Sequence, residues 1–251
     1  MLAFDPIFLA YAIPAVIFAG VSKAGFGSGA AFAAAAILAL IIEPGLALGI
    51  MLPLLMLIDV STLRPYWRKW HGPSARGIIL GAVPGVALGA LIYTMVDDDA
   101  IRLLIGAICL AFVGYQACRA MGWLAVSNWS YSHRWAAVTG VAAGFTSFVS
   151  HAGGPPVAVF LLGQGLGKTP YQATTVIVFW AVNIMKFVPY AFLGIFTAET
   201  WMAGLVLAPF AVLGAWLGVR AHHLVPDRVF FALTYVLLVI TGLRLMWLAL
   251  M

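Results

Sequence analysis

Two glycine-rich interruptions carry much of the polar chemistry that lies inside otherwise apolar sequence. The first reads AGVSKAGFGSGAAF over Ala19–Phe32, and the second reads GFTSFVSHAGGPP over Gly144–Pro156. Each combines glycines and hydroxyls with a basic side chain, Lys23 in the first and His151 in the second. Hydroxyls, backbone N–H groups and a positive charge are the groups with which proteins bind small oxyanions. The two stretches therefore predict an anion site.

A new half-helix is expected to begin at each interruption, near Ser28 in the first and near Pro155 in the second. The unpaired N–H groups and positive dipole end of a helix start favour an anion. Small residues also permit plain close packing of helices, but two such stretches in equivalent places favour binding. The expected substrate-binding residues of the two stretches are Ser22, Lys23, Gly27, Ser28, Gly29, Thr146, Ser147, Ser150, His151, Gly153 and Gly154.

A second group of polar residues lies in the apolar run 174–193. A charge such as that of Lys186 is costly there and usually faces the interior of a helix bundle. Asn183 lies three residues earlier, on the same helical face. Lys186 either binds the substrate or forms a structural ion pair with Asp59, which holds the equivalent place in the other half of the chain. Trp180 is assigned to the cavity wall, and Asn183 and Lys186 join the substrate-binding set.

Three residues of the interruptions have alternative roles. Lys23 either supplies positive charge at mid-depth in the membrane or is an ordinary lysine flanking the cytoplasmic surface. Ser150 is expected to cap a half-helix. His151 is expected to bind an oxyanion or relay a proton, with capping as the alternative. Asp59 and His151 are the proton-coupling candidates.

The composition indicates the environment of these residues. The 251 residues are 64% hydrophobic and only 8% charged, which indicates an integral membrane protein. The sequence shows no P-loop, HExxH, CxxC or GxSxG motif, so we expect no enzyme activity, no catalytic residues, no metal and no cofactor. The net charge of +5 comes from basic residues in short turns, so no nucleic acid is expected as a partner.

The sequence predicts an internal duplication, with a first transmembrane repeat at 1–126 and a second at 127–251. Gly20 aligns with Gly144, and Asp59 with Asn183, at one constant offset. Each repeat is expected to hold a broken helix pair, either re-entrant or spanning, and three spanning helices. The fold class is an all-α polytopic membrane protein with about eight to ten membrane segments. The expected apolar segments are 7–21, 30–42, 46–63, 74–96 and 100–121 in the first half, then 135–149, 156–165, 171–196, 200–221 and 228–250.

The charged turns set the orientation of the repeats. Basic residues at 64–76 mark a cytoplasmic turn, and the aspartates at 97–99 mark the opposite side. Each broken pair returns the chain to the side from which it started, so each repeat crosses an odd number of times. The second repeat is therefore expected to be inverted relative to the first. Inverted repeats whose broken helices meet near mid-membrane are typical of secondary transporters.

The paired motifs GVSKAGFGSGAAF and GFTSFVSHAGGPPVAVFLL, with the helix at 174–186 after the second, resemble the sulfite exporter TauE/SafE family, also grouped as toluenesulfonate uptake permeases. The resemblance covers nearly the whole chain. It implies a multi-pass transporter of the bacterial inner membrane for sulfite, sulfoacetate or related sulfonates, with or without proton coupling. Its partners would be the small anion and the lipid bilayer. Import, export and oligomeric state stay open, and a gated channel for small oxyanions is the alternative.

Overall fold

The computed structural model describes residues 2–26, 30–123, 131–224 and 227–251, and every regular element among them is helical. A short 3-10 turn (Leu2–Phe4) precedes the first helix. The helices of the first half are α1 (Pro6–Val21), a π-helical turn (Ser22–Phe26), α2 (Phe32–Leu38), α3 (Pro44–Tyr66), α4 (Gly72–Tyr93) and α5 (Asp98–Ala120). Those of the second half are α6 (His133–Ser150), α7 (Gly154–Gly163), α8 (Lys168–Phe192), α9 (Ala198–Leu224) and α10 (Asp227–Leu250).

The helices confirm the expected all-helical membrane fold. Seven of them in the described residues are long and apolar enough to cross a bilayer: α1 with its π-helical turn, α3, α4, α5, α8, α9 and α10. Helix α6 has 18 residues, α7 has 10 and α2 has 7. Both halves thus contain a broken pair followed by three long helices, in the order that the sequence predicts.

The first interruption differs in detail from the expectation. Helix α1 continues into the π-helical turn Ser22–Phe26, giving a 21-residue run that is long enough to span. The expected segment 7–21 is therefore part of a run long enough to cross the membrane. The following half-helix begins at Phe32 rather than near Ser28. Gly27, Ser28 and Gly29 lie outside the described residues.

The second interruption follows the prediction more closely. Helix α6 ends at Ser150, and His151 leaves it in the left-handed conformation, with φ 56°. Helix α7 then begins at Gly154 with prolines in its first turn. Proline fits there because its fixed φ suits a helix and its missing N–H would have no helical partner.

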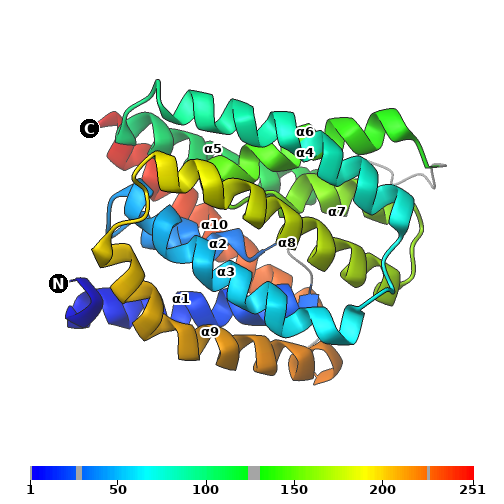
Figure 1. The fold of residues 1–251 in the computed structure, drawn as a ribbon, viewed down its shortest axis with the longest axis horizontal. Coiled ribbons are helices and arrows are strands. Elements are labelled where there is room, and N and C mark those ends of the chain that lie inside the picture. The colour runs from blue at the N-terminus through cyan, green and yellow to red at the C-terminus, as the bar shows by residue number, and fades with distance from the viewer. Residues whose placement is uncertain (1, 27–29, 124–130, 225–226) are drawn as a thin grey trace.

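Helices of one half pack mainly against helices of the other. Helix α4 lies along α6, and the corresponding pair α9 and α1 also packs together. Helices α3 and α8 contact each other, as do α5 and α10. In Figure 1, α1 begins at the end of the bundle that carries both termini, whereas α6 begins at the opposite end. The packing of one half against the other, with α1 and α6 starting at opposite ends of the bundle, supports the expected inverted repeat, which remains a prediction.

Backbones approach closely where these helices cross, because glycine faces the neighbouring chain. A Cβ atom added at Gly140 of α6 would lie 2.3 Å from the carbonyl oxygen of Ile78 in α4. At the corresponding crossing of α1 and α9, a Cβ atom at Gly20 would lie 2.6 Å from the backbone nitrogen of Ala215. In lipid, such small-residue contacts are a main source of helix association, because burial from water contributes little between helices.

We predict that Gly140→Ala lowers the free energy of unfolding by about 1–3 kcal/mol, because its Cβ must push the two backbones apart. The melting temperature of the purified protein in detergent measures the effect. Gly204→Ala in α9 is the matched control: nothing lies within 4 Å of its added Cβ. Alanine is the better helix former, so this control should be neutral or slightly stabilising. Equal melting temperatures for the two variants would contradict the packing account.

Candidate functional site

One face of α8 carries four side chains of a buried site, three of them polar. Gln172, Phe179, Asn183 and Lys186 follow one another at spacings that return to the same side of a helix. All four are buried, and Lys186 has no exposed surface at all. This face meets α3 and the two interruptions, so α8 brings together groups that the sequence separates widely.

Lys23 and Asp59 form an ion pair in the interior, where they are 4% and 1% exposed. The Lys23 ammonium also donates to the carbonyl oxygen of Leu55, at 3.3 Å. Asp59 Oδ2 accepts a hydrogen bond of 2.8 Å from Asn183 Nδ2. Asp59 Oδ1 faces the ammonium and accepts no further hydrogen bond from the described residues. Lys23 is therefore an interior residue and not a lysine flanking the membrane surface.

Lys186 lies in the same cluster, fully buried, and has no carboxylate partner among the described side chains. Its Nζ donates to the carbonyl oxygen of Ser147, at 3.0 Å, and contacts His151 Nδ1, at 2.8 Å. Among the described side chains, no carboxylate oxygen lies within 4.0 Å of Lys186. The expected alternative of an ion pair with Asp59 is thus wrong for this conformation, because Asp59 is paired with Lys23 instead.

His151 connects the second interruption to α3 and α8. Its Nε2 lies 3.2 Å from the carbonyl oxygen of Leu48, which can only accept, so Nε2 carries the proton. Nδ1 is then the acceptor for the Lys186 ammonium, and the imidazole is neutral. The left-handed backbone of His151 usually belongs to glycine, and any other residue there costs on the order of 1 kcal/mol. A strained position occupied by a side chain that joins two helices indicates a functional constraint.

The cluster holds two lysines and one carboxylate. With both lysines protonated, Asp59 ionised and His151 neutral, it would carry one net positive charge. A buried charge without a counter-ion is costly. An anion bound beside Lys186 would relieve this cost, so the cluster is chemically suited to a small anion.

A small cavity lies at the centre of the cluster. Its volume of about 10 Å³ gives room for a single water molecule. It is lined by Lys23, Ala31, Leu55, Ser147, His151, Phe179 and Asn183. The lining thus comes from both interruptions and from α3 and α8. Sulfite, with one sulfur and three oxygens, needs more space, so this conformation of the site is closed.

The structure brings some of the predicted residues to this cavity and leaves others apart. Lys23, Ser147, His151 and Asn183 line it, and Asp59 and Lys186 bind its lining residues. Ser22, Thr146, Ser150, Gly153, Gly154 and Trp180 are not among the lining residues. Trp180 is half-buried, so its assignment to the cavity wall receives no support from this conformation.

The hydroxyls of the second interruption act mainly within helix α6. Thr146 donates to the carbonyl oxygens of Ala142, at 2.8 Å, and Ala152, at 3.0 Å. Ser150 donates to the carbonyl oxygen of Thr146, at 2.9 Å. It does not cap α7, whose N-cap is Gly153 and which has no side-chain cap. The expected capping role of Ser150 at that helix start is therefore wrong.

The start of α7 offers fewer N–H donors than an ordinary helix start. Pro155 and Pro156 occupy its first turn and carry no N–H, so Gly153 and Gly154 hold the remaining free donors. A Cβ atom added at Gly153 would lie 2.8 Å from the Ala143 carbonyl oxygen and 2.9 Å from Ser147 Cβ. Gly153 therefore allows α7 to start against α6, directly behind the cavity wall.

Sequence reasoning left the facing of Gln172 open, although this residue supports the site. Its Nε2 donates to the carbonyl oxygen of Lys23, at 2.7 Å, which ties α8 to the π-helical turn. Its spacing from Asn183 and Lys186 was the available signal, because all three share one helical face. Ala31, Leu55 and Phe179 are ordinary apolar residues, and nothing in the sequence distinguished them as cavity lining.

A bundle of spanning helices around a small buried polar cavity, lined from two helix breaks, defines a multi-pass membrane protein. The chain belongs to the sulfite exporter TauE/SafE family, whose model matches residues 12–245. This match confirms the resemblance seen in the paired motifs, and membership implies membrane transport of the anion or sulfite type. No curated protein and no solved structure matches the chain.

We predict that Asp59→Asn lowers the free energy of unfolding by about 3–5 kcal/mol, because it leaves the Lys23 ammonium buried without a counter-ion. The double variant Lys23→Met/Asp59→Asn should recover a large part of this loss. Denaturant unfolding of the purified protein measures both changes.

The control for this prediction is Asp99→Asn, which breaks the more exposed pair with Arg102 at 2.6 Å. Exposed pairs contribute less than about 1 kcal/mol, so this variant should unfold almost like the wild type. A double variant no more stable than Asp59→Asn alone would contradict the pairing of Lys23 with Asp59.

Proposed function

We propose that the protein is a secondary transporter of small sulfur-containing anions, such as sulfite, sulfoacetate or related sulfonates, across the bacterial inner membrane. The observation that carries the proposal is the fully buried Lys186, with no carboxylate oxygen within 4.0 Å among the described side chains, beside a small cavity lined from the two interruptions. Membership of the TauE/SafE family supports the same substrate class.

In this proposal the anion binds on the cavity side of Lys186. The Lys186 ammonium turns from His151 Nδ1 toward the anion oxygens, and the Ser147 side chain and Asn183 amide line the space around them. Charge-assisted hydrogen bonds of this kind are about twice as strong as neutral ones. Asp59 keeps Lys23 neutralised, so a single negative charge completes the site.

Transport requires the closed cavity to open to each side in turn. The broken helices carry Lys23 and His151, and each packs against a helix of the other half, α1 against α9 and α6 against α4. Movement of one half against the other would open the cavity on one side while keeping it closed on the other. This is the alternating access expected of inverted repeats.

Proton coupling has a natural acceptor in this scheme. When Lys186 turns toward the anion, Nδ1 of His151 loses its hydrogen-bond donor and can take up a proton. Asp59 is the second group that could carry a proton, with Asn183 hydrogen-bonded to it at 2.8 Å. We propose His151 as the first choice, because it contacts the substrate-facing lysine directly.

A gated channel would also conduct anions through a positive site. A cavity of about 10 Å³ fits both a carrier and a shut channel, so the kinetics of the flux must separate the two. Flux through a channel would not saturate with substrate and could not concentrate it against a gradient.

Uptake into proteoliposomes tests the proposal, with sulfite, sulfoacetate, taurine and sulfate offered separately, with and without a pH gradient. We expect saturable flux of sulfite or a sulfonate. Lys186→Met should reduce it at least tenfold, because removing a charged hydrogen-bond donor costs about 1.5–3 kcal/mol. The control is Lys69→Met, an exposed lysine in the turn after α3, which should transport normally. Full transport by Lys186→Met would assign Lys186 a structural role only.

Gly153→Val should abolish transport while the protein still reaches the membrane. The valine side chain would have to displace Ser147 and Phe179, two residues of the cavity wall that lie within 3 Å of an added Cβ. Gly167→Val is the matched control, because an added Cβ there meets only Pro170 at an ordinary 3.8 Å. Proteoliposome flux and the melting temperature are measured together. A fully active Gly153→Val protein would separate this glycine from the site.

A further inference from the structure

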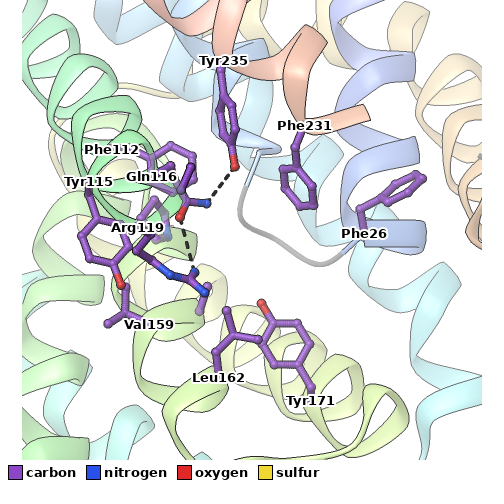
Figure 2. A pocket seen from close by; sticks show the side chains of 13 residues that line it. Phe26, Phe112, Tyr115, Gln116, Arg119, Val159, Leu162, Tyr171, Phe231 and Tyr235 are labelled. Carbon is purple, nitrogen blue, oxygen red and sulfur yellow. Dashed lines mark hydrogen bonds between the residues drawn. The ribbon is translucent and has the colours of Figure 1, made fainter. Parts of the chain in front are cut away.

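A second and larger hollow opens between α5, α7, α8 and α10, next to the π-helical turn that follows α1. Its volume is about 370 Å³, against about 10 Å³ for the closed cavity. Figure 2 shows its lining side chains, among them Arg119, Tyr171, Phe231 and Tyr235. This space is large enough for a small organic ion.

The polar side of this hollow is organised around Arg119. Gln116 Nε2 donates to the Tyr235 hydroxyl at 2.9 Å, and the Arg119 guanidinium lies 3.4 Å from Gln116 Oε1. Among the described side chains, no carboxylate oxygen lies within 4.0 Å of Arg119. The guanidinium and the Tyr171 hydroxyl point into the same space in Figure 2. A planar fork of five N–H donors suits a sulfonate or carboxylate.

The opposite side of the hollow is aromatic. The rings of Phe26 and Phe231 meet edge to face at 6.5 Å, and Phe231 stacks on Tyr235 at 6.0 Å. Such a wall binds an apolar body and adds nothing for a bare inorganic ion. A charged head group on one side and an apolar group on the other are the features of an organic anion.

The hollow continues toward the charged cluster. A neighbouring space of about 240 Å³ is lined by some of the same residues, including Phe26 and Tyr171, and also by Gln172. Gln172 donates to the Lys23 carbonyl oxygen at 2.7 Å. A single buried side chain therefore links the wall of this space to the residue that pairs with Asp59.

We propose that the hollow around Arg119 is a second anion-binding site, which takes an organic sulfonate or carboxylate with a short apolar chain. The head group binds Arg119 and the Tyr171 hydroxyl, and the chain lies on the aromatic wall. Anion binding at this site is argued from the contacts of the hollow alone. That the site is an entry site to the Lys186 cluster rests on the proposed transport function.

Isothermal titration calorimetry of the purified protein with ethane-, propane- and butanesulfonate tests the site. The wild type should bind two molecules per chain. One of the two sites should gain roughly three- to fourfold in affinity for each added CH₂, which corresponds to about 0.8 kcal/mol. Arg119→Gln should remove this chain-length-dependent site, and Arg134→Gln, an exposed arginine near the start of α6, should not.

The variants separate this proposal from the proposed function. Lys186→Met should keep the chain-length-dependent site and lose the other one. Two sites retained in Arg119→Gln would overturn the second site, whereas two sites retained in Lys186→Met would overturn the proposed role of the cluster. Titration is repeated in nanodiscs of zwitterionic lipid and of anionic lipid. Butanesulfonate binding blocked by anionic lipid alone would make the hollow a lipid head-group site and would also overturn the proposal.

Discussion

A buried lysine, without a carboxylate partner in the part of the chain that the structure describes, is the constraint on which the rest of this structure depends. Lys186 is fully enclosed, and its contacts are a carbonyl oxygen and a neutral imidazole nitrogen. Each of these groups accepts a hydrogen bond, but neither cancels a charge. A protonated lysine kept in a membrane in this way would be stabilised by an anion bound beside it. In the proposed function, the same group is thus both a cost to folding and the source of affinity.

The two helix breaks position the side chains that surround Lys186. His151 sits where α6 must end, in a backbone conformation that favours glycine, and its ring then reaches both α3 and α8. Lys23 sits on a π-helical turn, which places its side chain against Asp59. Irregular backbone at membrane depth is tolerated only inside protein or beside a cavity. The described irregular parts meet this condition, because the residues at 22–25 and 147–154 are buried inside the protein.

The fold was largely predictable, because long apolar runs and polar turns are strong signals in a membrane protein. The positions of α3, α5 and α9 follow the expected segments within a few residues. The half-helix start at Phe32 was not predictable, because nothing local in the sequence selects a π-helical turn over Ser22–Phe26. Pro155 and Pro156 gave the start of α7 a clearer signal.

The charged residues of the site could be predicted from the sequence, but which of them form the ion pair could not. Lys23, Asp59 and Lys186 stand out because a charge in an apolar run needs a reason. Which lysine pairs with Asp59 depends on how α3, α8 and the π-helical turn pack, and sequence spacing cannot decide it. Thr146 and Ser150 were expected at the anion because hydroxyls bind oxyanions. The structure shows them bonded to helix carbonyls, a local alternative open to every Ser and Thr.

The central claim is that the cavity beside Ser147 opens to the two sides of the membrane in turn and binds the anion when it is open. The most direct test places a cysteine at Ser147, with Cys109 and Cys118 replaced by alanine, in oriented proteoliposomes. A membrane-impermeant thiol reagent is then applied from one side at a time. We predict labelling from each side and protection by the transported sulfur anion. Absence of labelling from one side, or labelling unaffected by any transported anion, would contradict alternating access around this site.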